Sequence, residues 1–168
     1  MNVSDTPVAG YATAAATREY ARTVGADCPP ENYSDFGNPP LKLSSLGLGT
    51  FPGAASDAVD ADYTEIVQRA VGNGINVIDS AAHYRYGRSL RAVGVGLRRA
   101  FEAGVRREHM FLISKGGFLA FDSGIPPDLD RWFEREIIAK RLGVRADLSQ
   151  VHLISPAYIE YQLDHSLR

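Results

Sequence analysis

Residues 74–84 read GINVIDSAAHY, and this short run is typical of a buried strand that ends in a carboxylate. Gly74 stops the preceding helical pattern, and the apolar residues between Ile75 and Ile78 then run almost without interruption. Buried strands of parallel sheets have this near-continuous apolar character. We therefore expect a strand over residues 75–79, with Asp79 at its carboxyl end and Tyr84 in the loop that follows.

The segments on either side of this strand alternate between helical and extended patterns. Apolar residues recur at helical spacing over residues 57–73, where Asp57 can cap the helix, and again over residues 87–103. Short apolar runs occupy residues 44–50 and 110–115, and the second ends in Lys115. The order strand, helix, strand, helix, strand predicts an α/β fold with parallel strands and right-handed crossovers. The pair Gly94 and Gly96 is expected to let the second helix pack closely on the sheet.

The two flanks of this alternating region are less regular. Residues 1–42 are rich in Ala, Thr, Gly and Pro, so we expect an N-terminal surface arm that is partly irregular, with a helix around residues 11–24. Residues 43–168 are expected to form the folded unit. Within it, residues 116–148 lack a clear period, and residues 151–154 are a short strand or strand-like loop. Ser155 and Pro156 then begin a last helix.

Composition narrows the classes of function. The chain has 168 residues, with 18 Lys and Arg against 20 Asp and Glu, a net charge of −2. This balance gives no electrostatic reason to expect a nucleic acid or a membrane as partner. Cys28 is the only cysteine, which excludes an intrachain disulfide and favours a cytoplasmic location. Neither a signal peptide nor an apolar membrane span is visible in the sequence.

Three polar residues are expected at the carboxyl ends of the strands, where α/β folds place their chemistry: Asp79, Tyr84 and Lys115. A free tyrosine, with a pKa of about 10, is a poor proton donor at neutral pH, and a nearby ammonium favours the phenolate. A carboxylate keeps that ammonium charged and oriented. Such a set can protonate a carbonyl oxygen. The alternative is a structural ion pair of Asp79 with Lys115 beside a tyrosine that only packs.

The motifs LGLGT at residues 46–50, GINVIDSA at 74–81 with Tyr84 and GRS at 87–89, and FLISK at 111–115 together resemble the amino-terminal part of an aldo-keto reductase. This resemblance implies a (β/α)8 TIM barrel, of which the chain holds the first three or so β/α units. It also implies an NADPH cofactor and the reduction of a small-molecule aldehyde or ketone. By the same resemblance, Asp79, Tyr84 and Lys115 are catalytic, with Tyr84 as general acid, and Gly49, Thr50 and Asp79 bind the cofactor.

The fourth catalytic group of this family is a histidine at the end of the fourth strand, and two alignments compete for it. In the first, Asp147, Leu148 and His152 match that strand end. In the second, residues 155–168 match the third crossover helix, and residues 116–154 are an insertion of a kind that some bacterial members carry. We favour the second alignment, in which His152 lies within the insertion.

A complete barrel of this type needs about 250 residues. The sequence therefore predicts an incomplete, truncated barrel that is weak or inactive as a reductase alone. A second hypothesis is a non-catalytic half-barrel that associates with itself or with a partner through open sheet edges. A third, a dinucleotide-binding Rossmann domain based on Gly47, Gly49 and Gly53, is disfavoured because no helix begins at the third glycine. The sequence leaves the substrate and the choice of NADPH or NADH open.

Overall fold

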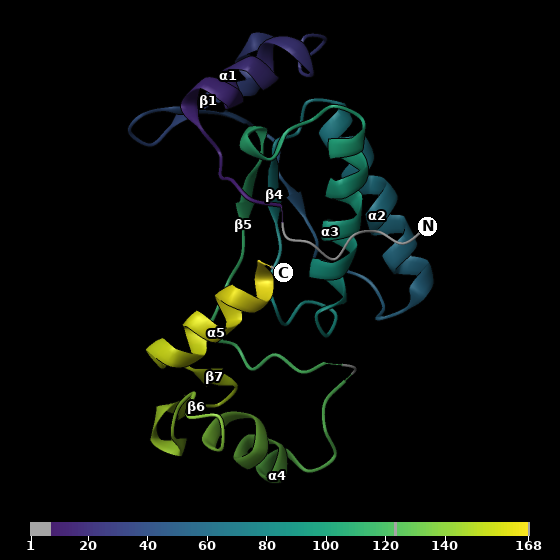
Figure 1. The fold of residues 1–168 in the computed structure, drawn as a ribbon. Helices are drawn as coiled ribbons and strands as arrows, with labels where there is room; N and C mark the ends of the chain where they lie inside the picture. Colours follow the sequence, from purple (N-terminus) through teal and green to yellow (C-terminus); the bar gives the residue numbers. More distant parts are fainter. Residues whose placement is uncertain (1–7, 123, 168) are drawn as a thin grey trace.

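A parallel sheet of three strands lies at the centre of the computed structural model, which describes residues 8–122 and 124–167. Its strands lie in the order β3 (Leu48–Gly49), β4 (Val77–Asp79) and β5 (Phe111–Ile113) (Figure 1). Helix α2 (Asp57–Gly72) connects β3 to β4, and α3 (Arg88–Glu102) connects β4 to β5. The predicted α/β class with parallel strands is confirmed. The strands are shorter than the apolar runs in the sequence that predicted them.

The register of this sheet brings three strand ends together. Gly49 pairs with Asp79, and Asp79 pairs with Ile113 on its other side. The loops that follow β3, β4 and β5 therefore leave the same edge of the sheet. This edge is where the predicted functional residues lie.

Helices α2 and α3 pack side by side on the sheet (Figure 1). A Cβ atom added at Gly96 would lie 2.7 Å from both the Thr64 carbonyl oxygen and the Val67 Cβ, so only glycine allows this approach. The predicted close packing of this glycine is thus found against α2 rather than against the sheet. Contact with α3 also explains why α2 buries Thr64 and leaves Ile66 45% exposed.

The start of α2 differs by one residue from the prediction. Ser56, not Asp57, is the N-cap, and its side-chain oxygen accepts a hydrogen bond from the Val59 amide at 3.4 Å. Asp57 lies in the first turn, where its charge favours the positive end of the helix dipole. At the other end, Gly74 adopts a φ of +92°, in the left-handed region that glycine favours.

The amino-terminal segment is part of the core, so the prediction of a surface arm is wrong for residues 8–42. It forms α1 (Ala14–Thr23), a 3₁₀ turn (Pro30–Asn32) and an antiparallel hairpin of β1 (Tyr33–Phe36) and β2 (Leu41–Ser44). Tyr20 is fully buried, and its hydroxyl donates to the Val71 carbonyl at 2.5 Å. Residues 1–7 lie outside the described residues.

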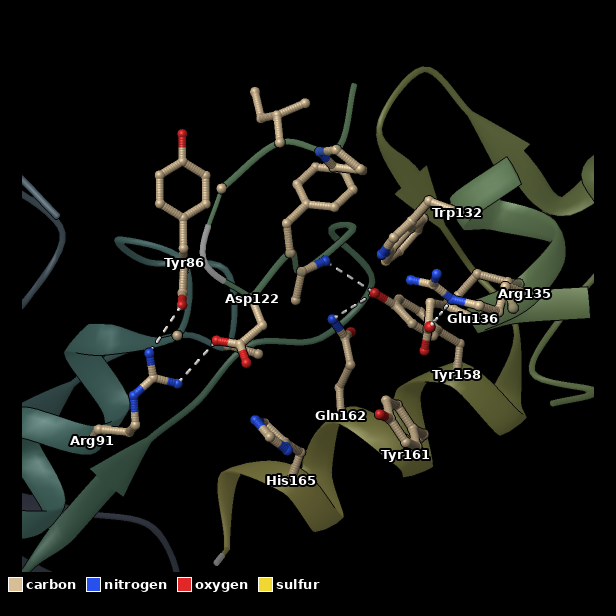
Figure 2. Close-up of a pocket in the computed structure, with 18 of the residues that line it drawn as sticks. Tyr86, Arg91, Asp122, Trp132, Arg135, Glu136, Tyr158, Tyr161, Gln162 and His165 are labelled. Atoms are coloured by element: carbon tan, nitrogen blue, oxygen red, sulfur yellow. Dashed lines mark hydrogen bonds and ion pairs between the residues drawn. The ribbon is translucent and has the colours of Figure 1, made fainter. Parts of the chain in front are cut away.

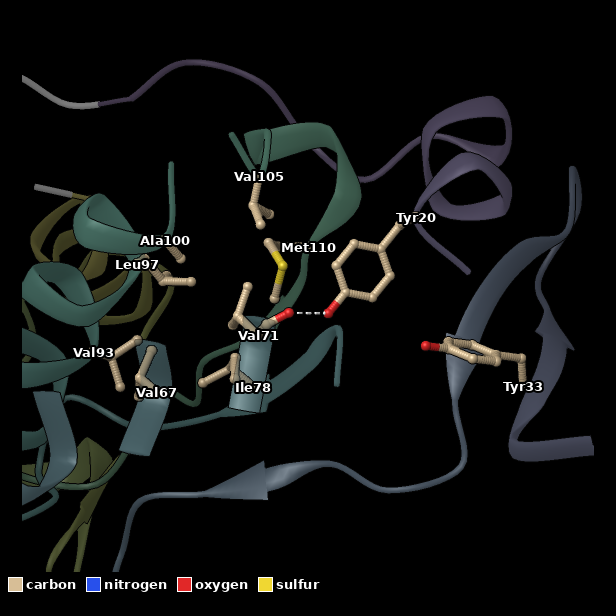
Figure 3. Close-up of a cluster of buried hydrophobic side chains, with 10 residues drawn as sticks. All are labelled: Tyr20, Tyr33, Val67, Val71, Ile78, Val93, Leu97, Ala100, Val105 and Met110. Atoms are coloured by element: carbon tan, nitrogen blue, oxygen red, sulfur yellow. Dashed lines mark hydrogen bonds between the residues drawn. The ribbon is translucent and has the colours of Figure 1, made fainter. Parts of the chain in front are cut away.

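The main core joins this amino-terminal segment to the sheet and its two helices (Figure 3). Tyr33 adds a second anchor, because its hydroxyl donates to the Gly74 carbonyl at 2.6 Å. Both tyrosines therefore place their rings in the apolar core, and their hydroxyls bond to the end of α2 and the connection that leads to β4. The buried members are Tyr20, Tyr33, Val67, Val71, Ile78, Val93, Leu97, Ala100, Val105 and Met110.

The segment from residue 116 to 154 and the last helix share a second, smaller core. A 3₁₀ turn (Arg107–His109) precedes β5. The elements after β5 are α4 (Leu129–Phe133), a π-helix (Glu134–Ile138), a 3₁₀ turn (Arg145–Asp147), β6 (Leu148–Ser149), β7 (His152–Leu153) and α5 (Pro156–Ser166). Ser155 caps α5 as predicted, with Pro156 in its first turn. The second core contains Leu119, Phe133, Ile137, Leu153 and Tyr158.

Side chains of α5 fix the first residues of this segment. The Gln162 side-chain oxygen, Oε1, accepts from the Gly117 amide at 2.6 Å, and the side-chain nitrogen, Nε2, donates to the Phe118 carbonyl at 2.8 Å. The Tyr158 hydroxyl accepts from the Ala120 amide at 3.0 Å. The chain just after β5 is therefore held in place by α5. Over the described part of the chain, no helix has the length and apolar character needed to cross a membrane.

Candidate active site

An ion pair between Asp79 and Lys115 lies at the carboxyl edge of the sheet. Asp79 is the last residue of β4, and Lys115 comes two residues after the end of β5. The Lys115 ammonium donates to the Asp79 carboxylate and, at 3.1 Å, to the Ser80 carbonyl oxygen. The two side chains are 42% and 36% exposed, so the pair faces solvent on one side. A ligand can therefore reach this pair from that side.

Tyr84 stands beside the ion pair. The Lys115 Nζ lies 4.8 Å from the centroid of the Tyr84 ring, within the range of a cation–π contact. Phe51 packs edge-on against the same ring at 5.1 Å between centroids. The structure thus brings together all three residues that the sequence singled out as catalytic.

The surroundings of Lys115 favour its charged form. Partial burial opposes the charge, but the hydrogen bond to Asp79 and the neighbouring Tyr84 phenol outweigh it, so the pKa of Lys115 is raised. The side chain is accordingly an ammonium at neutral pH. A permanent positive charge therefore stands against the ring of Tyr84.

The expected cofactor-binding positions adjoin this group. Thr50 is fully buried, and its hydroxyl lies 3.1 Å from the Asp79 carbonyl oxygen and 2.9 Å from Ser80 Oγ. The Thr50 carbonyl in turn accepts from the Ser89 hydroxyl at 2.7 Å. Thr50 therefore ties together the loops that follow β3 and β4. Gly49 differs, because an added Cβ atom would meet no other atom within 4 Å, so open space lies beside it.

A strained loop carries Tyr84. Arg85, Tyr86 and Gly87 have φ values of 50°, 59° and 77°, three consecutive residues in the left-handed region. For the first two this conformation costs free energy, which surrounding contacts must offset.

Arg85 supplies those contacts and is a residue that the sequence reasoning missed. Its guanidinium donates to the Ala54 carbonyl at 2.9 Å, to the Ser56 carbonyl at 3.3 Å and to the Asp60 carboxylate at 2.5 Å. It also lies 5.1 Å from the centroid of the Tyr63 ring. Its side chain is only 2% exposed. Arg85 therefore joins the loop after β3 to the loop that carries Tyr84.

His83 is a second residue without a predicted role that the structure places at the site. Its ring packs edge-on against Tyr84 at 4.8 Å and stacks on Phe118 at 4.3 Å. Burial, and then the charges of Lys115 and His152, lower the pKa of His83. The imidazole is therefore neutral at neutral pH. In the sequence, only the position of His83 next to Tyr84 could have indicated that it lies at the site.

His152 lies beyond Phe118, with 4.9 Å between their ring centroids. Its strand, β7, pairs antiparallel with β6 in a separate two-stranded sheet and does not join the parallel sheet. The alignment that made His152 the end of a fourth parallel strand is therefore wrong. The alternative, in which His152 lies in a segment added after Lys115, agrees with the observed topology.

Comparisons with known proteins find a family that matches the part of the chain containing this site. The sequence profile described as the Aldo/keto reductase family matches residues 45–166. A D-galacturonate reductase from Hypocrea jecorina is 39% identical over 75 residues, which are 45% of this chain and 22% of that protein.

A solved structure from Pseudomonas aeruginosa, assigned to the aldo-keto reductases by its description, also matches. It is 28% identical, with a TM-score of 0.38, over 72% of this chain and 44% of that one. The chain thus spans less than half the length of either relative. Because the family profile covers well over half of the chain, the chain belongs to the aldo/keto reductase family.

Proposed function

We propose that this chain carries the acid–base group of an NADPH-dependent reductase that acts on a small aldehyde or ketone, within a (β/α)8 barrel. The observation that carries the proposal is the position of the Lys115 ammonium, paired with Asp79 and 4.8 Å from the Tyr84 ring centroid. Membership in the aldo/keto reductase family supports it. A structural ion pair alone would not require a phenol at the same solvent-facing edge.

Each of the three residues has a separate task in this proposal. Tyr84 donates its hydroxyl proton to the carbonyl oxygen of the substrate, which becomes the hydroxyl of the product alcohol. Lys115 stabilises the phenolate that this transfer leaves. Asp79 holds the ammonium in position through a charge-assisted hydrogen bond. Arg85 and His83 position the loop and the ring of Tyr84.

The residues around Gly49 fit the cofactor. The open space beside Gly49 adjoins the exposed carboxylate of Asp79 at the end of the neighbouring strand. Because residue 49 has no side chain, this space is free to take a flat ring. Gly49 and Asp79 would contact the nicotinamide end of the cofactor, and the buried Thr50 would hold the loops beneath it in place. When bound, NADPH supplies the hydride that the carbonyl carbon accepts.

The test is a single-turnover experiment with the chain in excess over an aldehyde and with NADPH, in which the alcohol product is detected by mass spectrometry. D-galacturonate and D-glyceraldehyde are suitable substrates, the first because one relative is a D-galacturonate reductase. We expect slow reduction, because the match covers only 22% of the length of the D-galacturonate reductase.

Variants of two tyrosines give this experiment its control. Tyr84→Phe removes the acid and should lower the rate by about a hundredfold or more. Tyr11→Phe, at a position that is 75% exposed, should leave the rate unchanged. The absence of any alcohol, or equal rates for the wild type and Tyr84→Phe, would contradict the proposal.

A second candidate function is association with another copy through exposed apolar surface. Ile159 and Leu163 of α5 and Leu167 at its C-cap recur every four residues and are 40%, 54% and 63% exposed. Apolar stripes of this kind commonly mark interaction surfaces. Sedimentation of the chain tests this candidate, with Leu163→Glu as the disrupting variant. A monomer at all concentrations would contradict it.

A further inference from the structure

A cavity of about 560 Å³ lies between the start of α3, the helix α5 and residues 120–122 and 124–137 (Figure 2). Its volume is in the range of small-molecule sites. None of Asp79, Tyr84 and Lys115 lines it, so it is distinct from the candidate active site.

Aromatic rings form much of its wall. Trp132, the only tryptophan of the chain, meets Phe121 edge-on at 4.9 Å between centroids. Tyr161 stacks on Tyr158 at 6.4 Å on the α5 side of the cavity. Trp132 and Tyr161 project toward the open space (Figure 2). These rings offer flat apolar surfaces to a ligand.

A cation stands next to the tryptophan. Arg135 and Trp132 are three residues apart, a spacing that places both on one side of a helical turn. Arg135 donates through Nε to the Glu136 carboxylate at 2.6 Å, and the same carboxylate accepts from Lys140 at 2.6 Å. One carboxylate therefore serves two cations. Within the described residues, the Arg135 guanidinium donates through Nε alone and its side chain is 69% exposed, so its terminal nitrogens are open to an anion from solvent.

The backbone beneath this pair is irregular. Helix α4 continues directly into the π-helix Glu134–Ile138, in which the Ala139 amide donates to the Glu134 carbonyl at 2.9 Å. π-Helical turns are rare and occur frequently at functional sites. Arg135, Glu136 and Ile137 of this turn all line the cavity.

We propose that this cavity binds a small aromatic carboxylate, with its ring against Trp132 and its carboxylate on the terminal nitrogens of Arg135. The planar guanidinium matches the two oxygens of a carboxylate. A single negative charge suits the site better than a phosphate dianion, because Asp122 and Glu136 also face the cavity and would repel a larger charge.

The test uses the fluorescence of Trp132, which reports on the cavity directly because the chain has no other tryptophan. Benzoate is titrated into the chain without NADPH, so the result does not depend on the proposed reductase activity. We expect a saturable change in fluorescence. Benzyl alcohol has the ring but no carboxylate, and cyclohexanecarboxylate has the carboxylate but no flat ring. Both should bind more weakly than benzoate.

Two variants, one in α4 and one in the π-helix, distinguish binding at the cavity from a general attraction of benzoate to positive charge. Arg135→Gln should weaken benzoate binding by about tenfold or more, because a charge-assisted hydrogen-bond pair is lost. Arg131→Gln removes the same charge from an exposed residue of α4 that does not line the cavity, and should leave binding unchanged. Circular dichroism checks that both variants fold.

Three results would overturn the proposal. The first is a titration in which benzoate gives no saturable change. The second is an equal loss of binding in Arg135→Gln and Arg131→Gln. The third is binding of cyclohexanecarboxylate as tight as that of benzoate, which would remove the role of the aromatic wall.

Discussion

The Lys115 ammonium and the Tyr84 ring face each other at 4.8 Å, although 31 positions separate the two residues in the chain. The contact exists because β4 and β5 are adjacent and parallel, so that the loops after them leave the sheet at one edge. Asp79 holds the ammonium from the end of β4. The chemistry proposed for this chain depends on that arrangement.

Arg85 should be important for stability as well as for the position of Tyr84. We expect Arg85→Met to lower the free energy of unfolding by about 2 kcal/mol, because the Asp60 carboxylate and two loop carbonyls each lose one of their donors, while Asp60 keeps its ion pair with Arg88. Urea denaturation measures this change. Arg99→Met, at an exposed position of α3, is the control and should change stability little. Equal stability of the two variants would contradict the role given to Arg85.

The stability of the fold should fall as the pH drops through the ordinary histidine range, partly because of His83. Burial and the charges of Lys115 and His152 lower the pKa of His83, so the folded chain resists a proton that the unfolded chain takes up below its pKa of about 6.5. The loss therefore appears on the acid side. The melting temperature of His83→Asn should fall less than that of the wild type between neutral and mildly acid pH. His165→Asn, an exposed position, should behave as the wild type, and identical pH profiles for all three would refute the assignment.

The packing of α2 on α3 should depend on a single glycine. Gly96→Ala places a methyl group 2.7 Å from the Thr64 carbonyl oxygen and the Val67 Cβ, and should cost about 2 kcal/mol. Gly94→Ala is the matched control, because its methyl group would meet only the flexible end of Arg98, at 3.7 Å. That variant should be as stable as the wild type or more stable by about 0.5–1 kcal/mol, since alanine favours the helix. Thermal denaturation of both variants decides whether the close approach is real.

The sequence predicted the alternation of strands and helices and the meeting of Asp79, Tyr84 and Lys115, because both follow from local periodicity and from the geometry of parallel sheets. It did not predict that Tyr20 enters the core, since the polar and glycine-rich residues around it have no apolar period. Helix α2 buries Thr64 and leaves Ile66 exposed because it packs against α3, a tertiary contact that helical periodicity does not reveal.

The sequence also did not reveal the roles of Arg85 and His83. The partners of Arg85 are backbone carbonyls and Asp60, some 25 to 31 positions earlier, and no motif marks such contacts. His83 acquires its neighbours from residues 118 and 152, in the segment whose pattern was least regular. The antiparallel pairing of β6 with β7 likewise depends on a turn that the apolar pattern of residues 151–154 could not specify.

The most direct test of the central claim is the titration of Lys115 by nuclear magnetic resonance after methylation of the lysine side chains with carbon-13. Lys42, Lys115 and Lys140 are the only lysines, so the signals can be assigned by substitution. We predict a pKa of Lys115 above the ordinary lysine value in the wild type, and a lower value in Asp79→Asn and in Tyr84→Phe, because each variant removes a group that favours the ammonium. A pKa of Lys115 that is the same in all three proteins would show that the carboxylate, the ammonium and the phenol do not act as one unit.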